Sequence, residues 1–162
     1  MKQPIAVENI VIDTITHTIQ EHHSINADVL RLDKIHPIIS GNKWFKLKEY
    51  VVDAIDQNKK GIITFGGAWS NHIVATAALC QLKGLPSIGI IRGEQPKVLS
   101  SSLTKAIAYG MELRFISRDN YHEKIMPSDL STNEFYTINE GGFGTLGAKG
   151  AASILHYANR KK

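Results

Sequence analysis

The chain has 162 residues, of which 43% are hydrophobic and 21% are charged, and its formal net charge is +4. This apolar content excludes a disordered chain, and no apolar run reaches the roughly 20 residues that span a bilayer. Basic residues are interspersed with acidic ones, except for a short C-terminal run, so we expect neither nucleic-acid nor membrane binding. The single cysteine, Cys80, cannot form an internal disulfide bond, which favours a cytoplasmic protein.

The first 40 residues differ from the rest of the chain. Two short apolar segments, residues 10–12 and 27–32, predict strands, and the polar stretch between them contains histidines. After Gly41, short apolar segments begin to alternate with longer segments of helical periodicity. The change in pattern at Gly41 therefore predicts a second structural unit.

This second part of the chain predicts an α/β fold. Predicted strands cover residues 61–65, 87–91, 112–116 and 135–138, and predicted helices cover 44–58, 70–83, 98–109, 118–125 and 147–159. In the first helix one apolar face is formed by Leu47, Val51, Ala54 and Ile55. Such alternation indicates right-handed crossovers and a small open parallel sheet with helices on both faces. Ligands of such sheets bind at the carboxyl ends of the strands, here residues 66–70, 92–96, 117–118 and 139–147.

The most informative loop is the turn after the first of these strands, FGGAWSNH at residues 65–72. Gly66 and Gly67 allow the backbone to turn sharply, and Ser70 or Asn71 can cap the following helix. The exposed N–H groups of that helix start would then bind a carboxylate or a phosphate. The alternative is that Ser70 is an ordinary helix cap and that His72 is a structural histidine.

The sequence SGNK at residues 40–43 opens the first predicted helix, which places Lys43 in the first helical turn. The helix dipole disfavours a positive charge there and so favours the neutral amine, which is the form that attacks an aldehyde. The alternative is an exposed surface lysine, since Lys46 and Lys48 follow closely.

Residues 142–147 match the G-x-G-x-x-G pattern of dinucleotide-binding turns. The acidic residue expected about 20 positions later would fall beyond Lys162, so we favour close packing of a helix against a strand as the reason for these glycines. We expect no metal site, because His22 and His23 are adjacent and Cys80 has no partner at zinc-ligand spacing.

Three of these stretches, taken together and in order, resemble the 1-aminocyclopropane-1-carboxylate deaminase and D-cysteine desulfhydrase family. The sequence GNKWFKLKEY at residues 41–50 resembles that family's G-N-K-x-x-K-L-E-Y motif. GGAWSNH at residues 66–72 is similar to its G-G-x-x-S-N-H/Q loop. Residues 139–147 resemble its P-x-G-G-x-x-x-x-G segment, with Asn139 in place of the proline.

The resemblance implies a pyridoxal-phosphate enzyme of the tryptophan-synthase-β type (fold type II), a deaminase or lyase acting on a small amino acid, and a homodimer. It places the Schiff-base lysine at Lys43 and the site of the substrate carboxylate at Ser70, Asn71 and His72. It also places Asn71 near the ring hydroxyl of the cofactor and gives Ser70 a catalytic role. His72 favours the desulfhydrase side of the family.

The resemblance also divides the chain. Residues 1–40 correspond to strands of a larger domain, residues 41–146 to the small α/β domain, and residues 147–162 to a helix that returns to the larger one. The family's phosphate-binding loop and substrate tyrosines would follow Lys162, so we expect a truncated chain that is inactive alone. Two alternatives remain: a catalytically dead binding or oligomerisation module, and a nucleotide-binding α/β domain.

Overall fold

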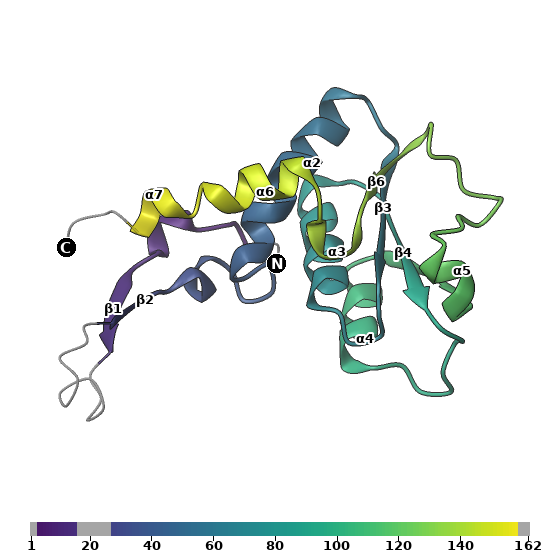
Figure 1. Ribbon diagram of the computed structural model, residues 1–162, viewed down its shortest axis with the longest axis horizontal. Helices are drawn as coiled ribbons and strands as arrows, with labels where there is room; N and C mark the ends of the chain where they lie inside the picture. The colour runs from purple at the N-terminus through teal and green to yellow at the C-terminus, as the bar shows by residue number, and fades with distance from the viewer. Residues whose placement is uncertain (1–2, 16–26, 159–162) are drawn as a thin grey trace.

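The structure, a computed structural model, describes residues 3–15 and 27–158 and contains two sheets (Figure 1). The larger sheet has four parallel strands in the order β5-β4-β3-β6. Its strands are β3 (Gly61–Gly66), β4 (Ser87–Arg92), β5 (Met111–Ile116) and β6 (Phe135–Ile138). The smaller sheet is an antiparallel pair, β1 (Ile12–Ile15) and β2 (Ala27–Leu30). The predicted α/β fold with a small parallel sheet is confirmed.

The helices follow the strands in the predicted order. They are α2 (Asn42–Asp56), α3 (Asn71–Lys83), α4 (Ser101–Ala108), α5 (Arg118–His122), α6 (Thr145–Ala152) and α7 (Leu155–Ala158). Three short 3-10 turns, η1 (Val7–Asn9), η2 (Leu32–Ile35) and η3 (Glu140–Gly142), complete the described chain. Among the described residues, no helix is both long enough and apolar enough to cross a bilayer.

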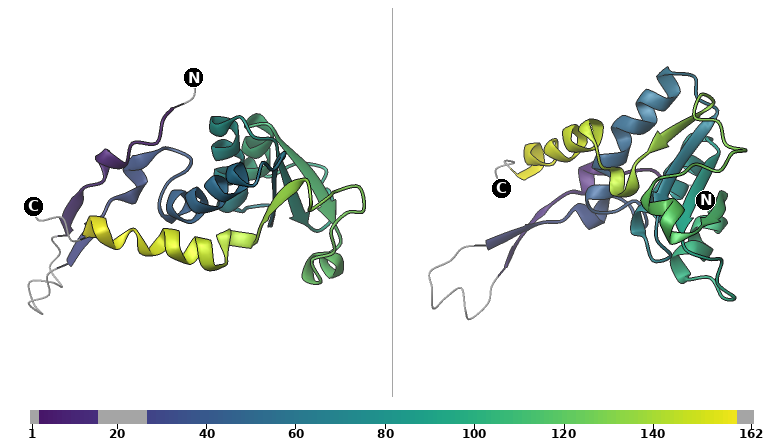
Figure 2. Two further views of the ribbon diagram at one scale, coloured as in Figure 1. Left: turned by 90° about the horizontal axis from the view of Figure 1, so that it is seen from above. Right: turned by 45° about the vertical axis from the view of Figure 1, so that its right-hand side comes forward.

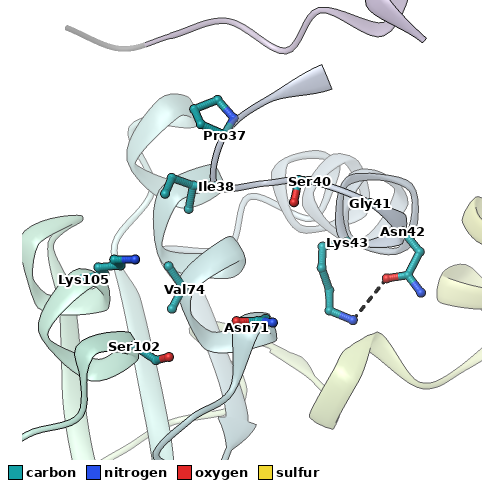
Figure 3. Close-up of a pocket in the computed structure, with 10 residues that line it drawn as sticks. All are labelled: Pro37, Ile38, Ser40, Gly41, Asn42, Lys43, Asn71, Val74, Ser102 and Lys105. Atoms are coloured by element: carbon teal, nitrogen blue, oxygen red, sulfur yellow. Dashed lines mark hydrogen bonds between the residues drawn. The ribbon is translucent and has the colours of Figure 1, made fainter. Parts of the chain in front are cut away.

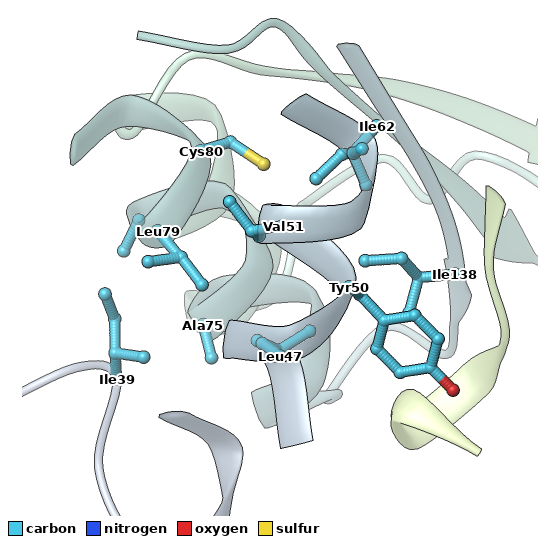
Figure 4. Close-up of a cluster of buried hydrophobic side chains, with 11 residues drawn as sticks. Ile39, Leu47, Tyr50, Val51, Ile62, Ala75, Leu79, Cys80 and Ile138 are labelled. Carbon is cyan, nitrogen blue, oxygen red and sulfur yellow. The ribbon is translucent and has the colours of Figure 1, made fainter. Parts of the chain in front are cut away.

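The main core lies between one face of the parallel sheet and helices α2 and α3. Ile62 of β3, Leu47 of α2 and Leu79 of α3 are fully buried there (Figure 4). The opposite face is covered less extensively. Phe65 packs there against the ring of Tyr121 from the short helix α5, and the segment that follows α5 completes the cover.

Each predicted helix differs from the observed one at one boundary or more: α2 is shifted to 42–56, α3 begins one residue later, and α5 ends at His122 rather than at residue 125. In the two other helices the difference coincides with local hydrogen bonds. The helix predicted over 98–109 begins at Ser101, since Ser100 caps it with an Oγ that accepts from the Leu103 N–H at 3.2 Å. The helix predicted over 147–159 is divided into α6 and α7. The division falls at Ser153, whose Oγ donates to the carbonyl of Gly150 at 2.6 Å.

Helix α2 is buried on more than one side. Leu47, Val51 and Ala54 face the core as predicted, but Ile55 is exposed, which corrects that part of the expectation. Phe45 and Tyr50 are buried instead, because α6 packs along α2. The approach is close: a Cβ added to Gly150 would lie 1.9 Å from the Phe45 carbonyl oxygen.

The β1–β2 ribbon stands apart from the four-stranded sheet, and α6 and α7 run between the two regions (Figure 2). The strand predicted at residues 10–12 begins only at Ile12, since Ile10 is buried in a separate cluster with Ile35 and Phe45. The adjacent histidines of the predicted polar stretch, His22 and His23, lie outside the described residues.

Candidate active site

A cavity of about 340 Å³ lies where the first turns of α2, α3 and α4 converge (Figure 3). Its apolar wall includes Ile38 and Val74. The polar side chains that line it are Ser40, Asn42, Lys43, Asn71, Ser102 and Lys105. The cavity therefore combines two amines, two amides and two hydroxyl groups from three helix starts.

Lys43 is the second residue of α2, in the first helical turn as predicted. Its Nζ donates to Asn42 Oδ1 at 3.1 Å, and its backbone N–H donates to the Ser40 carbonyl at 3.3 Å. Burial lowers the pKa of the Lys43 amine, and the positive charge of Lys46 lowers it further. The neutral amine is therefore favoured, in the direction the sequence predicted. Burial, the larger cause, becomes visible only in the structure.

The turn before α3 brings Ser70 and Asn71 to the helix start. Ser70 Oγ accepts from the Ile73 N–H at 3.3 Å, so its side chain is the N-cap. The Asn71 amide faces the cavity (Figure 3). Neither Gly66 nor Gly67 adopts a left-handed conformation, which corrects the expectation that both glycines are needed for a sharp turn. Instead, a Cβ at Gly66 would lie 2.5 Å from Ile73 Cγ1, so glycine lets the helix approach the strand.

His72 lies beneath the cavity rather than in its lining, and its side chain is only 3% exposed. Its Nε2 lies 2.8 Å from Thr64 Oγ1, which donates its own proton to the Ile138 carbonyl at 2.9 Å. The hydroxyl hydrogen of Thr64 is used in the bond to Ile138. His72 Nε2 is therefore assigned a hydrogen, which it donates to Thr64 Oγ1. Nδ1 is buried without a hydrogen-bond partner in the described structure. Burial, and then the charges of Lys43 and Lys46, lower the pKa of His72 to about 4.

The structure thus brings Lys43 and Asn71 into one cavity, whereas Ser70 and His72, the neighbours of Asn71 in the sequence, are not among its lining residues. Ser102 and Lys105 of α4 also line the cavity, and the sequence analysis missed both. The segment leading to α4 was predicted to carry a ligand loop, at residues 92–96. The two residues that line this cavity, Ser102 and Lys105, instead lie within α4, which begins directly after its N-cap Ser100.

The glycines of the 142–147 segment are explained by packing. A Cβ at Gly147 would lie 1.9 Å from the Gly142 carbonyl oxygen, and one at Gly144 would lie 2.6 Å from the hydroxyl oxygen of Tyr50. Gly144 also has a φ of +138°, which side chains rarely adopt. Close packing is therefore the reason for these glycines, but the prediction that a helix packs against a strand here is corrected. Their packing partners are the turn itself and α2 rather than a strand.

Sequence comparison relates the chain to named proteins. It is 32% identical over 142 residues to a Thermotoga maritima protein provisionally named a 1-aminocyclopropane-1-carboxylate deaminase. It is 31% identical over 129 residues to the bifunctional D-cysteine desulfhydrase/1-aminocyclopropane-1-carboxylate deaminase of Arabidopsis thaliana, which is named as mitochondrial. These alignments cover 82% and 69% of the chain but only 44% and 31% of the two relatives. No protein-family model matches the chain.

Solved structures show the same fold. The crystal structure of an ACC deaminase homologue superposes with a TM-score of 0.77 at 24% identity, covering 95% of this chain and 49% of that one. Maize serine racemase superposes with a TM-score of 0.60 at 14% identity, over 94% of this chain and 45% of that one. The resemblance predicted from the three sequence motifs is thus confirmed, and the chain spans less than half the length of these relatives.

Proposed function

We propose that this chain carries the cofactor-binding lysine of a pyridoxal-phosphate-dependent deaminase or lyase that acts on a small amino acid. The observation that carries the proposal is the position of Lys43, whose amine has a lowered pKa and lines a cavity together with the Asn71 amide. The similarity to proteins named 1-aminocyclopropane-1-carboxylate deaminase and D-cysteine desulfhydrase supports the same reaction class.

The residues of the cavity fit the chemistry of this cofactor. An aldehyde requires a neutral amine, which burial favours at Lys43. The phenolic oxygen of the cofactor requires a hydrogen-bond donor, which the Asn71 amide can supply from the opposite wall. Ser40, Ser102 and Lys105 add further donors for an anionic ligand. Bound pyridoxal phosphate would act as an electron sink for a carbanion at the substrate α-carbon.

Within this scheme, the side chains of the chain have separate tasks. Lys43 would hold the cofactor through its side-chain amine, and the free amine of Lys43 would be placed to accept a proton from the substrate. The start of α3, which follows Ser70, presents backbone N–H groups that would bind the substrate carboxylate. His72 is buried with its proton on Nε2, so it would support this turn from below rather than contact the carboxylate with its ring.

The proposal is tested by trapping the lysine chemically. The chain is titrated with pyridoxal phosphate and reduced with borohydride, and the labelled peptide is identified by mass spectrometry. We expect the label on Lys43 and its loss in Lys43→Ala. Lys105→Ala serves as the matched control, since it removes another lysine from the same cavity and should leave the Lys43 label in place.

Diffuse labelling of surface lysines, equal in the wild type and in Lys43→Ala, would contradict the proposal for this chain. A specific label without turnover of D-cysteine or of 1-aminocyclopropane-1-carboxylate would support cofactor attachment and leave the chain as a non-catalytic binding module.

A further inference from the structure

A second cavity, of about 730 Å³, lies at the carboxyl edge of the parallel sheet. All four strands contribute to it through the residues at or just beyond their ends. The lining residues are Gly67, Ala68, Trp69, Arg92, Arg118, Tyr121, His122, Lys124 and Glu140. None of them lines the cavity that contains Lys43, and the turn that leads into α3 separates the two. Ligands of open α/β sheets characteristically bind at this edge.

The charge of this second cavity is positive. Its described lining residues include three basic side chains, Arg92, Arg118 and Lys124. They include one carboxylate, that of Glu140. No carboxylate lies within ion-pair distance of either arginine in the described structure. Arg92 instead lies over the ring of Tyr121, with its Cζ 5.7 Å from the ring centroid. The guanidinium groups therefore keep their hydrogen-bond donors available for a ligand.

A buried hydroxyl group lies in the same wall. Tyr121 is only 7% exposed, and its hydroxyl group lies near the Glu140 carboxylate without a hydrogen bond of ordinary length in the described structure. Burial, together with the nearby Glu140 carboxylate, raises the pKa of Tyr121. The hydroxyl group therefore stays protonated and remains a donor at neutral pH. A bound oxyanion at ordinary hydrogen-bond distance would satisfy this buried donor better than the more distant Glu140 carboxylate does.

We infer that this cavity is a binding site for a small molecule that carries an oxyanion, a carboxylate or a phosphate. Arg92 and Arg118 provide the planar donors that match an oxyanion in two-point hydrogen bonds, and the Tyr121 hydroxyl adds a neutral donor. The exposed indole of Trp69 at the rim offers an apolar surface for the rest of the ligand. This site does not depend on the cofactor proposed for the Lys43 cavity.

The test is a titration of the 162-residue chain, followed by NMR of its backbone amides, with inorganic phosphate in one arm and succinate in the other. We expect saturable shifts at residues 67–69, 92 and 118–124. Arg92→Gln should weaken binding about tenfold, and Tyr121→Phe, which keeps the buried ring, about fivefold. Lys34→Gln removes one exposed positive charge outside the cavity and should change affinity less than about twofold.

The two arms distinguish the source of the oxyanion, because tighter phosphate binding assigns a phosphorylated ligand and tighter succinate binding assigns a carboxylate. Non-saturable shifts in both arms would overturn the inference. Shifts centred on Lys43 and Asn71, or an equal loss of affinity in Lys34→Gln and Tyr121→Phe, would overturn it as well.

Discussion

The parallel sheet and the β1–β2 ribbon are built from similarly short strands but differ in what surrounds them. Every residue of β3 is buried, because β4 and β6 pair with it and both faces of the sheet are covered. No residue of β1 or β2 is buried, since these strands pair only with each other. We therefore expect the free energy of folding to be concentrated in the sheet, with the ribbon contributing little.

The strongest test of this difference makes the same truncation in both regions. Ile62→Ala in β3 removes a fully buried side chain and should lower the free energy of unfolding by about 2–5 kcal/mol. Ile15→Ala in β1 removes a side chain that is 43% exposed and should cost less than about 1 kcal/mol. Chemical denaturation of both variants measures the two values, and equal losses would show that the ribbon is as important to stability as the sheet.

A second prediction concerns pH and the packing of α3 on the sheet, where His72 of α3 contacts Thr64 of β3. His72 has a pKa of about 4 in the folded chain against 6.5 for an ordinary histidine, so between these values the unfolded chain binds more protons. Stability should therefore fall as the pH drops from about 6.5 towards 4, by up to about 3 kcal/mol. Denaturation at a series of pH values measures this slope.

His72→Gln should reduce that slope, since glutamine does not titrate. The matched control is His122→Gln, which removes an exposed histidine and should leave the slope unchanged. A slope of the same size in His72→Gln would assign the pH dependence to other groups.

The helix between the two regions gives a third prediction. Gly150→Ala places a methyl group where the Phe45 carbonyl oxygen lies, so α6 must shift away from α2. We expect a loss of about 1–3 kcal/mol, the usual range for an overpacked contact. Ala148→Ser, at an exposed position of the same helix, should change stability by less than about 0.5 kcal/mol. Similar melting temperatures for both variants would contradict this packing contact.

The smallest effect is expected in the ribbon. Arg31 donates to Asp13 at 2.7 Å, and this pair joins the β1 strand to the segment that follows β2. Both side chains are partly exposed, so Asp13→Asn should cost no more than about 1 kcal/mol. Added salt should reduce the difference from the wild type further, and an effect comparable with that of Ile62→Ala would contradict the proposed division of stability.

The sequence predicted most of the parallel sheet because its signals are local. The strand at Phe135–Ile138 and the end of α3 at Lys83 were placed correctly. The helix boundaries at Ser100 and Ser153 differ from the predicted ones. They depend on side-chain hydrogen bonds, which the periodicity of apolar residues does not reveal. The burial of Phe45 and Tyr50 was missed because α6, about 90 positions later in the sequence, covers a second side of α2.

By itself, the sequence determined the α/β fold, the family resemblance and the position of Lys43 in the first turn of a helix. Only the tertiary structure showed that Ser102 and Lys105 share its cavity, that His72 is buried against Thr64, and that Arg92 lies over Tyr121. The physical reason is the range of the interactions involved. Apolar periodicity and helix caps act between residues a few positions apart, whereas burial, pKa shifts and cavities depend on segments that only folding brings together.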